Sequence, residues 1–441
     1  MSRTLKKLAF FSKNLLFRPR SIRFARRFAC ESQLEEPERQ ALILSRLRDI
    51  VKCAWDNSPY YREKYRDVGL SDGIINSFAE FELLPPLEKS EIREHGDLIL
   101  NQNFPKRLLK ESSTGGSTGI PVKVFHDRSI PLDTVGWYVL RQFGGDISDN
   151  AAFLERYNPH RQKFPVNKLM WLPTRRCFLD VSNITNERWH DFYRRCRGIS
   201  PVYIQGYVGA VEEFAEFLSR NSLSLPSLRF VWTTAAPLTD ASRLRMELIF
   251  KCPVYSQYGC CECYWLASEC RQKQMHYFDT IRHFEILDEN NRPLPDGETG
   301  DLAITDLLNH AFPLIRYRNG DRLKKLPGNC SCGSRLPLLG KINGRTTDII
   351  RLPGGGCVPG DFLTTIFDHA PEAVNRFQVV QHKDHSITIR YVPASTGSEA
   401  AVAEVCAGLG KQFGGIKVSA EAVDEIPSDR GKIRFVVSEF K

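Results

Sequence analysis

Apolar residues recur at helical spacing in the first part of the chain and predict a helix there. Between residues 36 and 66 they fall on one helical face, as Leu44, Leu47 and Val51 illustrate. This pattern ends close to Pro59. A proline is rarely found inside a helix, because its ring clashes with the preceding turn and it lacks an amide hydrogen.

Further along, short apolar runs alternate with helical segments. Strands are expected at 202–205, 228–234 and 253–258, and helices at 130–143, 208–218 and 240–250. Strands that alternate with helices in this way form parallel βαβ units. The middle of the chain is therefore predicted to have an α/β core.

The pattern changes after about residue 277, where short strands and turns replace the helices. A small module then closes the chain, with strands near 376–381, 386–392 and 416–423 and a helix over 398–411. We predict an α/β fold with three parts. They are an N-terminal arm over 1–35, a large domain of α/β subdomains over 36–344, and a small α+β C-terminal domain over 345–441.

Composition supports a globular protein of roughly two to three domains in 441 residues. Hydrophobic residues make up 42% and charged residues 26%, which is ordinary for such a protein. The sequence has no apolar run long enough for a membrane-spanning helix. The cysteine count of 13 is odd and no export signal is visible, so we expect free thiols in a reducing compartment, the cytoplasm.

The net charge of +9 comes from the N-terminal arm. Of the 61 Lys and Arg residues, nine lie within residues 1–30, which contain no acid, and the remaining 52 equal the 52 Asp and Glu residues. The globular body is therefore not expected to bind nucleic acid. We favour a helix packed on the body for the arm. Peripheral contact with an anionic membrane and an organellar transit peptide are the alternatives.

A glycine-rich stretch, Thr114-Gly115-Gly116-Ser117-Thr118-Gly119-Ile120-Pro121, is the strongest local signal. Its glycines let backbone amides turn inward, and its hydroxyls add donors without charge, as a nucleotide phosphate chain requires. It matches neither a Walker A loop nor a Rossmann fingerprint. With the short strand at 122–125 it forms a predicted hairpin. A Gly/Ser-rich surface turn is the alternative.

Two stretches follow predicted strands and suit a nucleotide. Ala235, Ala236 and Pro237 leave a strand with small side chains, so that a flat base could approach the backbone. Tyr258 and Gly259 end the next strand, and ligands bind at the carboxyl ends of strands in open α/β sheets.

Three charged residues complete this picture. Glu262 could hold Mg²⁺ beside the phosphates, because Mg²⁺ takes one or two carboxylates together with phosphate oxygens. Asp321, expected after a tight turn, is suited to accept hydrogen bonds from ribose hydroxyls, and Arg345 lies where two domains could meet. The alternatives are a rim salt bridge for Glu262, a turn cap for Asp321 and a surface cation for Arg345.

Four residues form a separate candidate metal site: Cys270, His276, Cys330 and Cys332. Three thiolates and one imidazole are a complete tetrahedral set for structural Zn²⁺ and leave no open position for catalysis. The alternative is four unliganded residues.

In order and spacing, these stretches resemble the signature motifs of the adenylate-forming superfamily of acyl-CoA ligases and adenylation domains. Residues 114–121 are similar to its phosphate loop Thr/Ser-Ser-Gly-Ser/Thr-Thr-Gly-x-Pro. Its motifs Tyr-Gly-x-x-Glu, Tyr-x-x-Gly-Asp and Gly-Arg-x-x-Asp appear at 258–262, 317–321 and 344–348, and residues 427–434 loosely match its C-terminal Pro-Arg-x-x-x-Gly-Lys-x-x-Arg.

The chain is most similar to the phenylacetate–CoA ligase and CapK branch, from about residue 40 to the end. The stretches 57–61, 84–89, 313–317 and 330–333 are typical of it, and its members resemble this chain in the cysteine and histidine set. Two departures stand out. Ile120 replaces a common lysine, and Cys260-Cys261 replaces a small or hydroxyl pair, which is expected to reshape the acyl pocket or the Mg²⁺ shell.

The resemblance implies ATP-dependent activation of a carboxylic acid as an acyl-adenylate, followed by transfer to a thiol such as CoA. It implies that Thr114, Gly115, Gly116, Ser117, Thr118 and Gly119 hold the β- and γ-phosphates, and that Ala235, Ala236 and Tyr258 flank adenine, with Pro237 and Gly259 also in the nucleotide site. It places Asp321 on the ribose and Arg345 on the ribose or a phosphate. Thr118, Glu262 and Lys432 would be catalytic, with Glu262 on Mg²⁺ and Lys432 reaching in from a mobile C-terminal domain. Arg351 is the hinge candidate.

Two other functions stay open. The acyl group could pass to an amine or hydroxyl in polysaccharide biosynthesis, as in CapK-like proteins, or to a carrier protein. Alternatively, the chain could be a non-catalytic nucleotide-binding scaffold. These motifs do not identify the acid. A homodimer is the expected oligomeric state, because dimers are the most common oligomers of soluble proteins.

Overall fold

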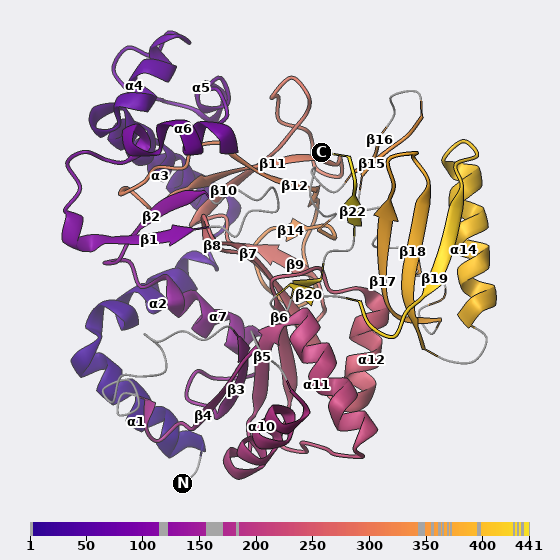
Figure 1. Cartoon of the computed structure of the whole chain (residues 1–441). Coiled ribbons are helices and arrows are strands. Elements are labelled where there is room, and N and C mark those ends of the chain that lie inside the picture. Colours follow the sequence, from indigo (N-terminus) through magenta and orange to yellow (C-terminus); the bar gives the residue numbers. More distant parts are fainter. Residues whose placement is uncertain are drawn as a thin grey trace. The chain divides into compact units, whose positions relative to one another are not determined.

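The structure, a computed structural model, describes residues 3–113, 122–155, 171–181, 185–342, 349–353, 357–359, 363, 366–367, 370, 373–394, 398–426, 428–429, 432–433 and 436–440 (Figure 1). Contacts divide the chain into two compact units. Unit 1 comprises Met1–Leu16, Phe143–Gln257 and Ile342–Lys441, and unit 2 comprises Phe17–Gln142 and Tyr258–Lys341. The expected boundaries after residues 35 and 344 stay predictions.

Unit 1 contains a parallel sheet with strand order β7-β6-β5-β3-β4. The strands are β3 (Ala151–Glu155), β4 (Arg176–Asp180), β5 (Tyr203–Tyr207), β6 (Phe230–Thr234) and β7 (Val254–Cys260), and the last three residues of β7 belong to unit 2. Gly206 in β5 fits only without a side chain, because a Cβ there would lie 2.6 Å from the Leu154 Cβ. The parallel α/β core predicted from the alternating pattern is confirmed.

Three helices cover this sheet: α10 (Asn186–Ile199), α11 (Val208–Arg220) and α12 (Asp240–Phe250) (Figure 1). α10 and α12 each follow an N-cap threonine, Thr185 and Thr239, whose side chain accepts the backbone N–H of the residue three positions later. Trp189, Phe214 and Met246 are buried against the strands. Burial of these apolar faces fixes the helices on the sheet.

The C-terminal part of unit 1 is a four-stranded sheet in the order β19-β18-β17-β22, with α14 (Ser398–Gln412) packed along it (Figure 1). Its strands are β17 (Val374–Gln381), β18 (Ile387–Pro393), β19 (Val418–Ala422) and β22 (Val436–Ser438). The pairs β15 (Ile349–Arg351) with β16 (Cys357–Pro359) and β20 (Ser428–Asp429) with β21 (Lys432–Ile433) are antiparallel. The small α+β module is thus confirmed.

Helices form much of unit 2. They are α2 (Pro19–Glu31), α3 (Glu36–Asn57), α4 (Pro59–Arg66), α5 (Phe78–Glu82), α6 (Lys89–Ile99) and α7 (Val135–Gln142), with 3₁₀ turns at Lys106–Leu108 and Leu132–Thr134. The end of the predicted helix close to Pro59 is confirmed by α3, and the rest of the stretch 36–66 is occupied by a second helix, α4. Ser58 is extended between them, and Pro59 opens α4, where its missing amide N–H costs no hydrogen bond.

The strands of unit 2 are antiparallel. β1 (Leu109–Ser113) pairs with β2 (Lys123–Asp127), and β10 (Arg282–Leu287), β11 (Gly300–Asp306) and β12 (Tyr317–Leu323) form a second sheet. A third group has the order β13-β14-β9-β8, with β8 (Tyr264–Glu269), β9 (Met275–Tyr277), β13 (Lys325–Leu326) and β14 (Leu338–Leu339). Within the described residues, the helices are either too short or too polar to cross a membrane.

Candidate active site

The glycine-rich stretch is held at both ends by a hairpin. Ser113 of β1 lies opposite Lys123 of β2, so the strands bring the two ends of the intervening segment together. Residues 114–121 themselves lie outside the described residues. The predicted phosphate contacts of Thr114, Gly115, Gly116, Ser117, Thr118 and Gly119, and the catalytic role of Thr118, therefore stay predictions.

Tyr258 and Asp321, which are 63 positions apart, meet in unit 2. The Tyr258 hydroxyl donates to Asp321 Oδ2. Asn319 Nδ2 donates to the same carboxylate oxygen at 2.6 Å and to the Tyr258 hydroxyl oxygen at 2.9 Å. All three side chains are buried, so the carboxylate is held in one orientation. Burial, followed by the charge of Asp321, raises the pKa of Tyr258 well above its usual value, so the phenol stays protonated.

Asp321 does not follow a tight turn, as the sequence suggested; it lies inside β12. Residues 319–321 face the single residue Leu302 of β11, because Asp301 pairs with Arg322 and Ala303 with Arg318. Gly320 has φ +87°, a backbone conformation that side chains disfavour. Burial alternates along β12, so that Asp321 lies on the same buried face as Tyr317 and Asn319, where its carboxylate meets Tyr258.

Glu262 has two partners, one of which, Tyr317, lies in β12 with Asp321. The Tyr317 hydroxyl donates to Glu262 Oε1 at 3.0 Å, and Lys89 Nζ lies 3.3 Å from the same oxygen. Glu262 is 4% exposed, and Lys89 opens α6 behind a capping box formed by Glu88 and Glu91. Burial, together with the neighbouring Glu262 charge, raises the pKa of Tyr317. Both contacts converge on Oε1, an arrangement compatible with a cation at the other oxygen.

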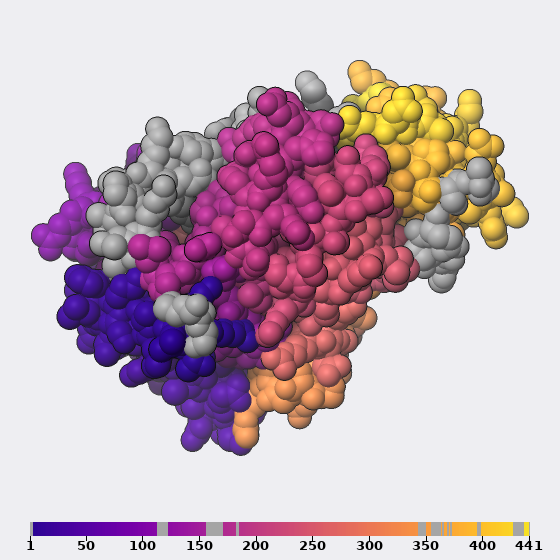
Figure 2. Space-filling model, turned by 90° about the horizontal axis from the view of Figure 1, so that it is seen from below, coloured from indigo at the N-terminus to yellow at the C-terminus, as the bar shows by residue number. Residues whose placement is uncertain are grey.

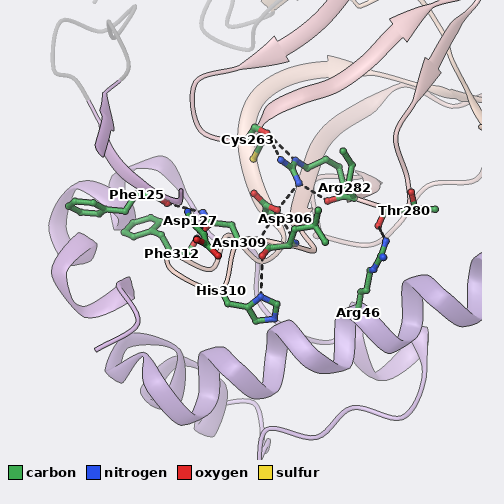
Figure 3. Close-up of polar contacts among 12 residues, drawn as sticks. Arg46, Phe125, Asp127, Cys263, Thr280, Arg282, Asp306, Asn309, His310 and Phe312 are labelled. Atoms are coloured by element: carbon green, nitrogen blue, oxygen red, sulfur yellow. Dashed lines mark hydrogen bonds and ion pairs between the residues drawn. The ribbon is translucent and has the colours of Figure 1, made fainter. Parts of the chain in front are cut away.

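The turn that carries Glu262 is anchored by a buried ion pair (Figure 3). Arg282 donates to the Cys263 carbonyl through Nε at 3.0 Å and Nη2 at 2.6 Å, and its Nη1 lies 2.7 Å from Asp306 Oδ1. Asp306 Oδ1 also accepts the backbone N–H of Asn309 at 3.2 Å. The side-chain amide of Asn309 donates in turn, through Nδ2, to the Phe125 carbonyl of β2 at 2.8 Å. One network therefore holds both the Glu262 turn and the strand that leaves the glycine-rich segment.

His126 in β2 is a further link to this turn. Its Nε2 lies 3.1 Å from the Cys261 carbonyl, and its ring stacks on Tyr264 with centroids 4.1 Å apart. Burial lowers the pKa of His126 to about 4, so the ring is neutral near pH 7 and Nε2 donates the hydrogen bond. The Cys261 side chain is exposed, so this residue contributes its backbone to the contact.

Ala235, Ala236 and Pro237 follow β6 in unit 1. Ala235 has φ +74°, so the chain turns sharply as it leaves the strand. Thr233 and Ser256 lie side by side in β6 and β7, which places the ends of both strands at the same edge of the sheet. The predicted adenine pocket also requires Tyr258 and Gly259, which belong to unit 2, and it stays a prediction.

The C-terminal candidates are only partly described. Arg345 and the Lys432 side chain lie outside the described residues, although the backbone of Lys432 pairs with Asp429. The Arg351 N–H donates to Gln381 Oε1 at 2.9 Å, and Gln381 Nε2 donates to the Arg351 carbonyl at 2.7 Å. These bonds attach residue 351 to the C-terminal sheet. Its role as a hinge stays a prediction.

The predicted cysteine and histidine set comes together in unit 2. Its four ligand atoms, on Cys270, His276, Cys330 and Cys332, all lie within 4.8 Å of one another. The sulfurs of Cys270 and Cys330 are 3.7 Å apart, and Cys332 Sγ is 3.5 Å from His276 Nε2. A tetrahedron with Zn–S bonds of about 2.3 Å has edges of about 3.8 Å. The four residues therefore form a cluster that could hold a metal ion.

The surroundings of this cluster support that use. His276 Nδ1 lies 2.8 Å from the Leu336 carbonyl, so Nδ1 carries the hydrogen and Nε2 is left as the ligand. Gly333 has φ +82°, which allows the tight turn after Cys332. Burial raises the pKa of the Cys270 thiol to about 12, so a cation is needed to stabilise its thiolate.

Several residues of the site were not singled out from the sequence. Lys89 lies in the stretch 84–89 that is typical of the phenylacetate–CoA ligase and CapK branch, but no role was assigned to it. Asn319 and Tyr317 fall inside a motif whose aspartate alone was chosen. No sequence signal marked His126 or Arg282, because their importance comes only from contacts across the fold.

Comparisons with known proteins agree with this arrangement. A family model described as the CapK C-terminal domain matches residues 351–439. Phenylacetate-coenzyme A ligase of Thermus thermophilus is 24% identical over 364 residues, which cover 79% of this chain and 79% of that protein. Protein CapK of Staphylococcus aureus is 24% identical over 400 residues, which cover 87% of this chain and 86% of that protein.

The fold also resembles that of a solved enzyme. A crystal structure of 2-hydroxyisobutyryl-CoA ligase in the postadenylation state, in complex with 2-HIB-AMP, matches with a TM-score of 0.77 at 18% identity. The match covers 93% of this chain and 91% of that one. At this identity the likeness concerns the fold, and it confirms the expected mixed α/β architecture with a small C-terminal sheet domain.

Proposed function

We propose that this chain, as a member of the adenylate-forming ligase superfamily in its phenylacetate–CoA ligase and CapK branch, activates a carboxylic acid with ATP and transfers the acyl group to a thiol such as CoA. The observation that carries the proposal is the buried pair of carboxylates. Asp321 is held by Tyr258 and Asn319, and Glu262 is held by Tyr317.

The first step forms an acyl-adenylate. A substrate carboxylate oxygen attacks the α-phosphorus of ATP, the bond to the bridging oxygen of the β-phosphate breaks, and pyrophosphate leaves with that electron pair. In this proposal Asp321 would accept hydrogen bonds from the ribose hydroxyls, and Glu262 would hold Mg²⁺, which would neutralise charge on the phosphates. The Lys432 ammonium balances the charge that develops between the carboxylate and the α-phosphate. The protein contributes mainly position and charge.

The second step transfers the acyl group. A thiolate attacks the acyl carbonyl, the bond to the AMP oxygen breaks, and AMP leaves. The similarity to phenylacetate-coenzyme A ligases supports CoA as the acceptor of the acyl group. The match to Protein CapK over 86% of its length favours a second candidate, in which an amine or hydroxyl takes the acyl group.

Pyrophosphate release tests the proposal. We expect release from Mg²⁺ and ATP with one class in a panel of aryl, fatty, hydroxy and amino acids. Dependence of product formation on CoA would then identify the acceptor. Lys432→Ala should abolish release, whereas Lys411→Ala, an exposed lysine of α14 in the same C-terminal module, should leave it unchanged.

Two outcomes would contradict the proposal. Equal release by the Lys432→Ala and Lys411→Ala variants would remove Lys432 from the mechanism. Stabilisation by ATP without pyrophosphate release from any acid would favour a non-catalytic nucleotide-binding scaffold.

Zinc at Cys270, His276, Cys330 and Cys332 is structural in this proposal. It joins the loop before β14 to β9 and needs three thiolates and one neutral imidazole. Mass spectrometry of the purified protein should find about one zinc per chain. Cys332→Ser should lose the metal and lower the melting temperature, whereas Cys30→Ser, an exposed cysteine of α2, should change neither. Equal zinc content in both variants would contradict this assignment.

A further inference from the structure

The first helix, α1 (Arg3–Phe17), is fixed to unit 1 by one of its faces. Phe10 and Asn14 are buried, and Phe10 stacks on Trp171 with centroids 5.2 Å apart. At the start of the helix Arg3 forms an ion pair of 2.7 Å with a buried carboxylate, that of Asp149. We expected the N-terminal arm to pack on the body as a helix, and the buried face of α1 confirms this for residues 3–17.

The opposite face of α1 carries leucines that are turned to solvent. Leu5, Leu8, Leu15 and Leu16 are 55%, 60%, 57% and 73% exposed. At about 100° per residue these four side chains fall within an arc of about 100°. Single exposed leucines need no explanation, but a stripe of four along one helix usually marks an interaction surface. We call this stripe the leucine face.

The next helix, α2, exposes arginines instead. Ile22, Phe24 and Phe28 are buried, and the side chains between them that reach solvent are mostly arginines. The exposed arginines are Arg20, Arg23, Arg26 and Arg27. In Figure 2 the N-terminal residues form part of the open surface, coloured indigo. A leucine face is therefore followed at once in the chain by a cationic face.

We propose that the leucine face of α1 binds the surface of an anionic lipid membrane, and that the positive charge of residues 1–30 attracts this segment to the acidic headgroups. A helix that lies in a membrane interface buries leucines among the acyl chains, while nearby arginines contact acidic headgroups. Charge distribution favours this partner. Residues 1–30 contain nine basic residues and no acid, and the rest of the chain is neutral. A protein partner would have to supply a large acidic surface beside an apolar one.

The attachment of α1 to the body agrees with this partner. Membrane binding by an isolated segment requires the segment to fold at the same time, which weakens binding. Here the buried face already holds α1 as a helix, so its leucines are presented together before any lipid is met. The proposed contact is peripheral, and it does not depend on the proposed enzymatic activity.

Sedimentation with vesicles tests the proposal on the full chain. We expect binding to vesicles of phosphatidylcholine with about a third phosphatidylglycerol, little binding to phosphatidylcholine alone, and weaker binding as salt rises. The quadruple variant Leu5→Ser, Leu8→Ser, Leu15→Ser, Leu16→Ser should bind at least about tenfold more weakly. Its matched control is Leu244→Ser with Leu248→Ser, two leucines of α12 that are 52% and 69% exposed, and it should bind as the unchanged protein does.

The arginines are tested separately. Arg20→Gln, Arg23→Gln and Arg26→Gln together should weaken binding to the anionic vesicles by about tenfold or more. The control, Arg194→Gln with Arg220→Gln, removes two exposed arginines whose side chains are 74% and 75% exposed elsewhere in the chain, and it should have little effect. All variants change exposed side chains, and equal melting temperatures will show that they fold alike.

Three results would overturn the proposal. The first is that the protein binds neither kind of vesicle. The second is that the leucine variant and its control lose vesicle binding equally, and the third is that neutral and anionic vesicles bind the protein equally well. A dimer in solution that the leucine variant abolishes, without vesicle binding, would assign the leucine face to a second copy of the chain instead.

Discussion

Replacing Asp306 by Asn tests whether the buried ion pair with Arg282 holds the candidate active site together. Both side chains are completely buried, and Arg282 Nη1 lies 2.7 Å from Asp306 Oδ1 (Figure 3). Asparagine has nearly the same shape and keeps an oxygen that can accept the N–H groups of Leu308 and Asn309. The substitution therefore removes the negative charge and leaves the guanidinium buried without a counter-ion.

The expected cost follows from that burial. Removing one partner of a buried pair destabilises a protein by about 3–5 kcal/mol, because the remaining charge cannot regain water. For a folding unit of roughly 200 residues, this loss lowers the melting temperature by about 10 °C. Thermal unfolding at a fixed scan rate, followed by circular dichroism, measures the change.

An exposed ion pair provides the matched control. Asp191 lies 2.9 Å from Arg195, with side chains 52% and 41% exposed, and Asp191→Asn should cost no more than about 1 kcal/mol. The double variant Arg282→Met, Asp306→Asn should lose less than the sum of the two single variants, by about 1–3 kcal/mol. The reasoning is refuted if Asp306→Asn and Asp191→Asn lower the melting temperature equally.

Three further predictions concern the same region. Lys89→Met removes a hydrogen bond that orients Glu262 and should raise the KM for ATP about tenfold, whereas Lys89→Arg should restore most of the affinity; an unchanged KM in the Met variant would exclude this role. Tyr258→Phe removes a charged hydrogen bond to Asp321 and should lower the free energy of unfolding by about 1.5–3 kcal/mol in urea titrations; no loss would mean that this bond is not formed. His126 has a pKa lowered from 6.5 to about 4, so its contribution to stability is full above pH 6.5 and is lost as pH falls toward 4. His126→Gln should therefore weaken the decline in stability between pH 7 and pH 4 by about 3 kcal/mol, and parallel pH profiles would contradict the assignment.

The local elements were largely predictable, because they depend on neighbours in the sequence. The alternation of apolar runs and helical segments located β5, α11, β6 and α12, and the C-terminal module has its helix at Ser398–Gln412. The end of the first helix near Pro59 was predictable as well, because α3 ends at Asn57. That Pro59 opens a second helix, α4, was not expected, although a proline is well tolerated at the first position of a helix.

The site was predictable only as a set of separate residues. The motifs contain Tyr258 and Asp321, but periodicity does not reveal that these two side chains, 63 positions apart, form a hydrogen bond. Likewise, Lys89 received no role, because its partner Glu262 is 173 positions away in the chain. Contacts of this kind depend on how distant strands pair.

By itself, the sequence determined the α/β class, the concentration of positive charge in the first 30 residues and the four cysteine and histidine side chains that could ligate a metal. These features depend on composition, short-range periodicity and the chemistry of individual residues. Tertiary structure alone decided that Cys270 and Cys330 lie 3.7 Å apart and that the leucines of α1 are left facing solvent. The physical reason is that burial and proximity depend on how the elements pack. Which apolar face of a helix is buried is decided only by the elements that pack against it.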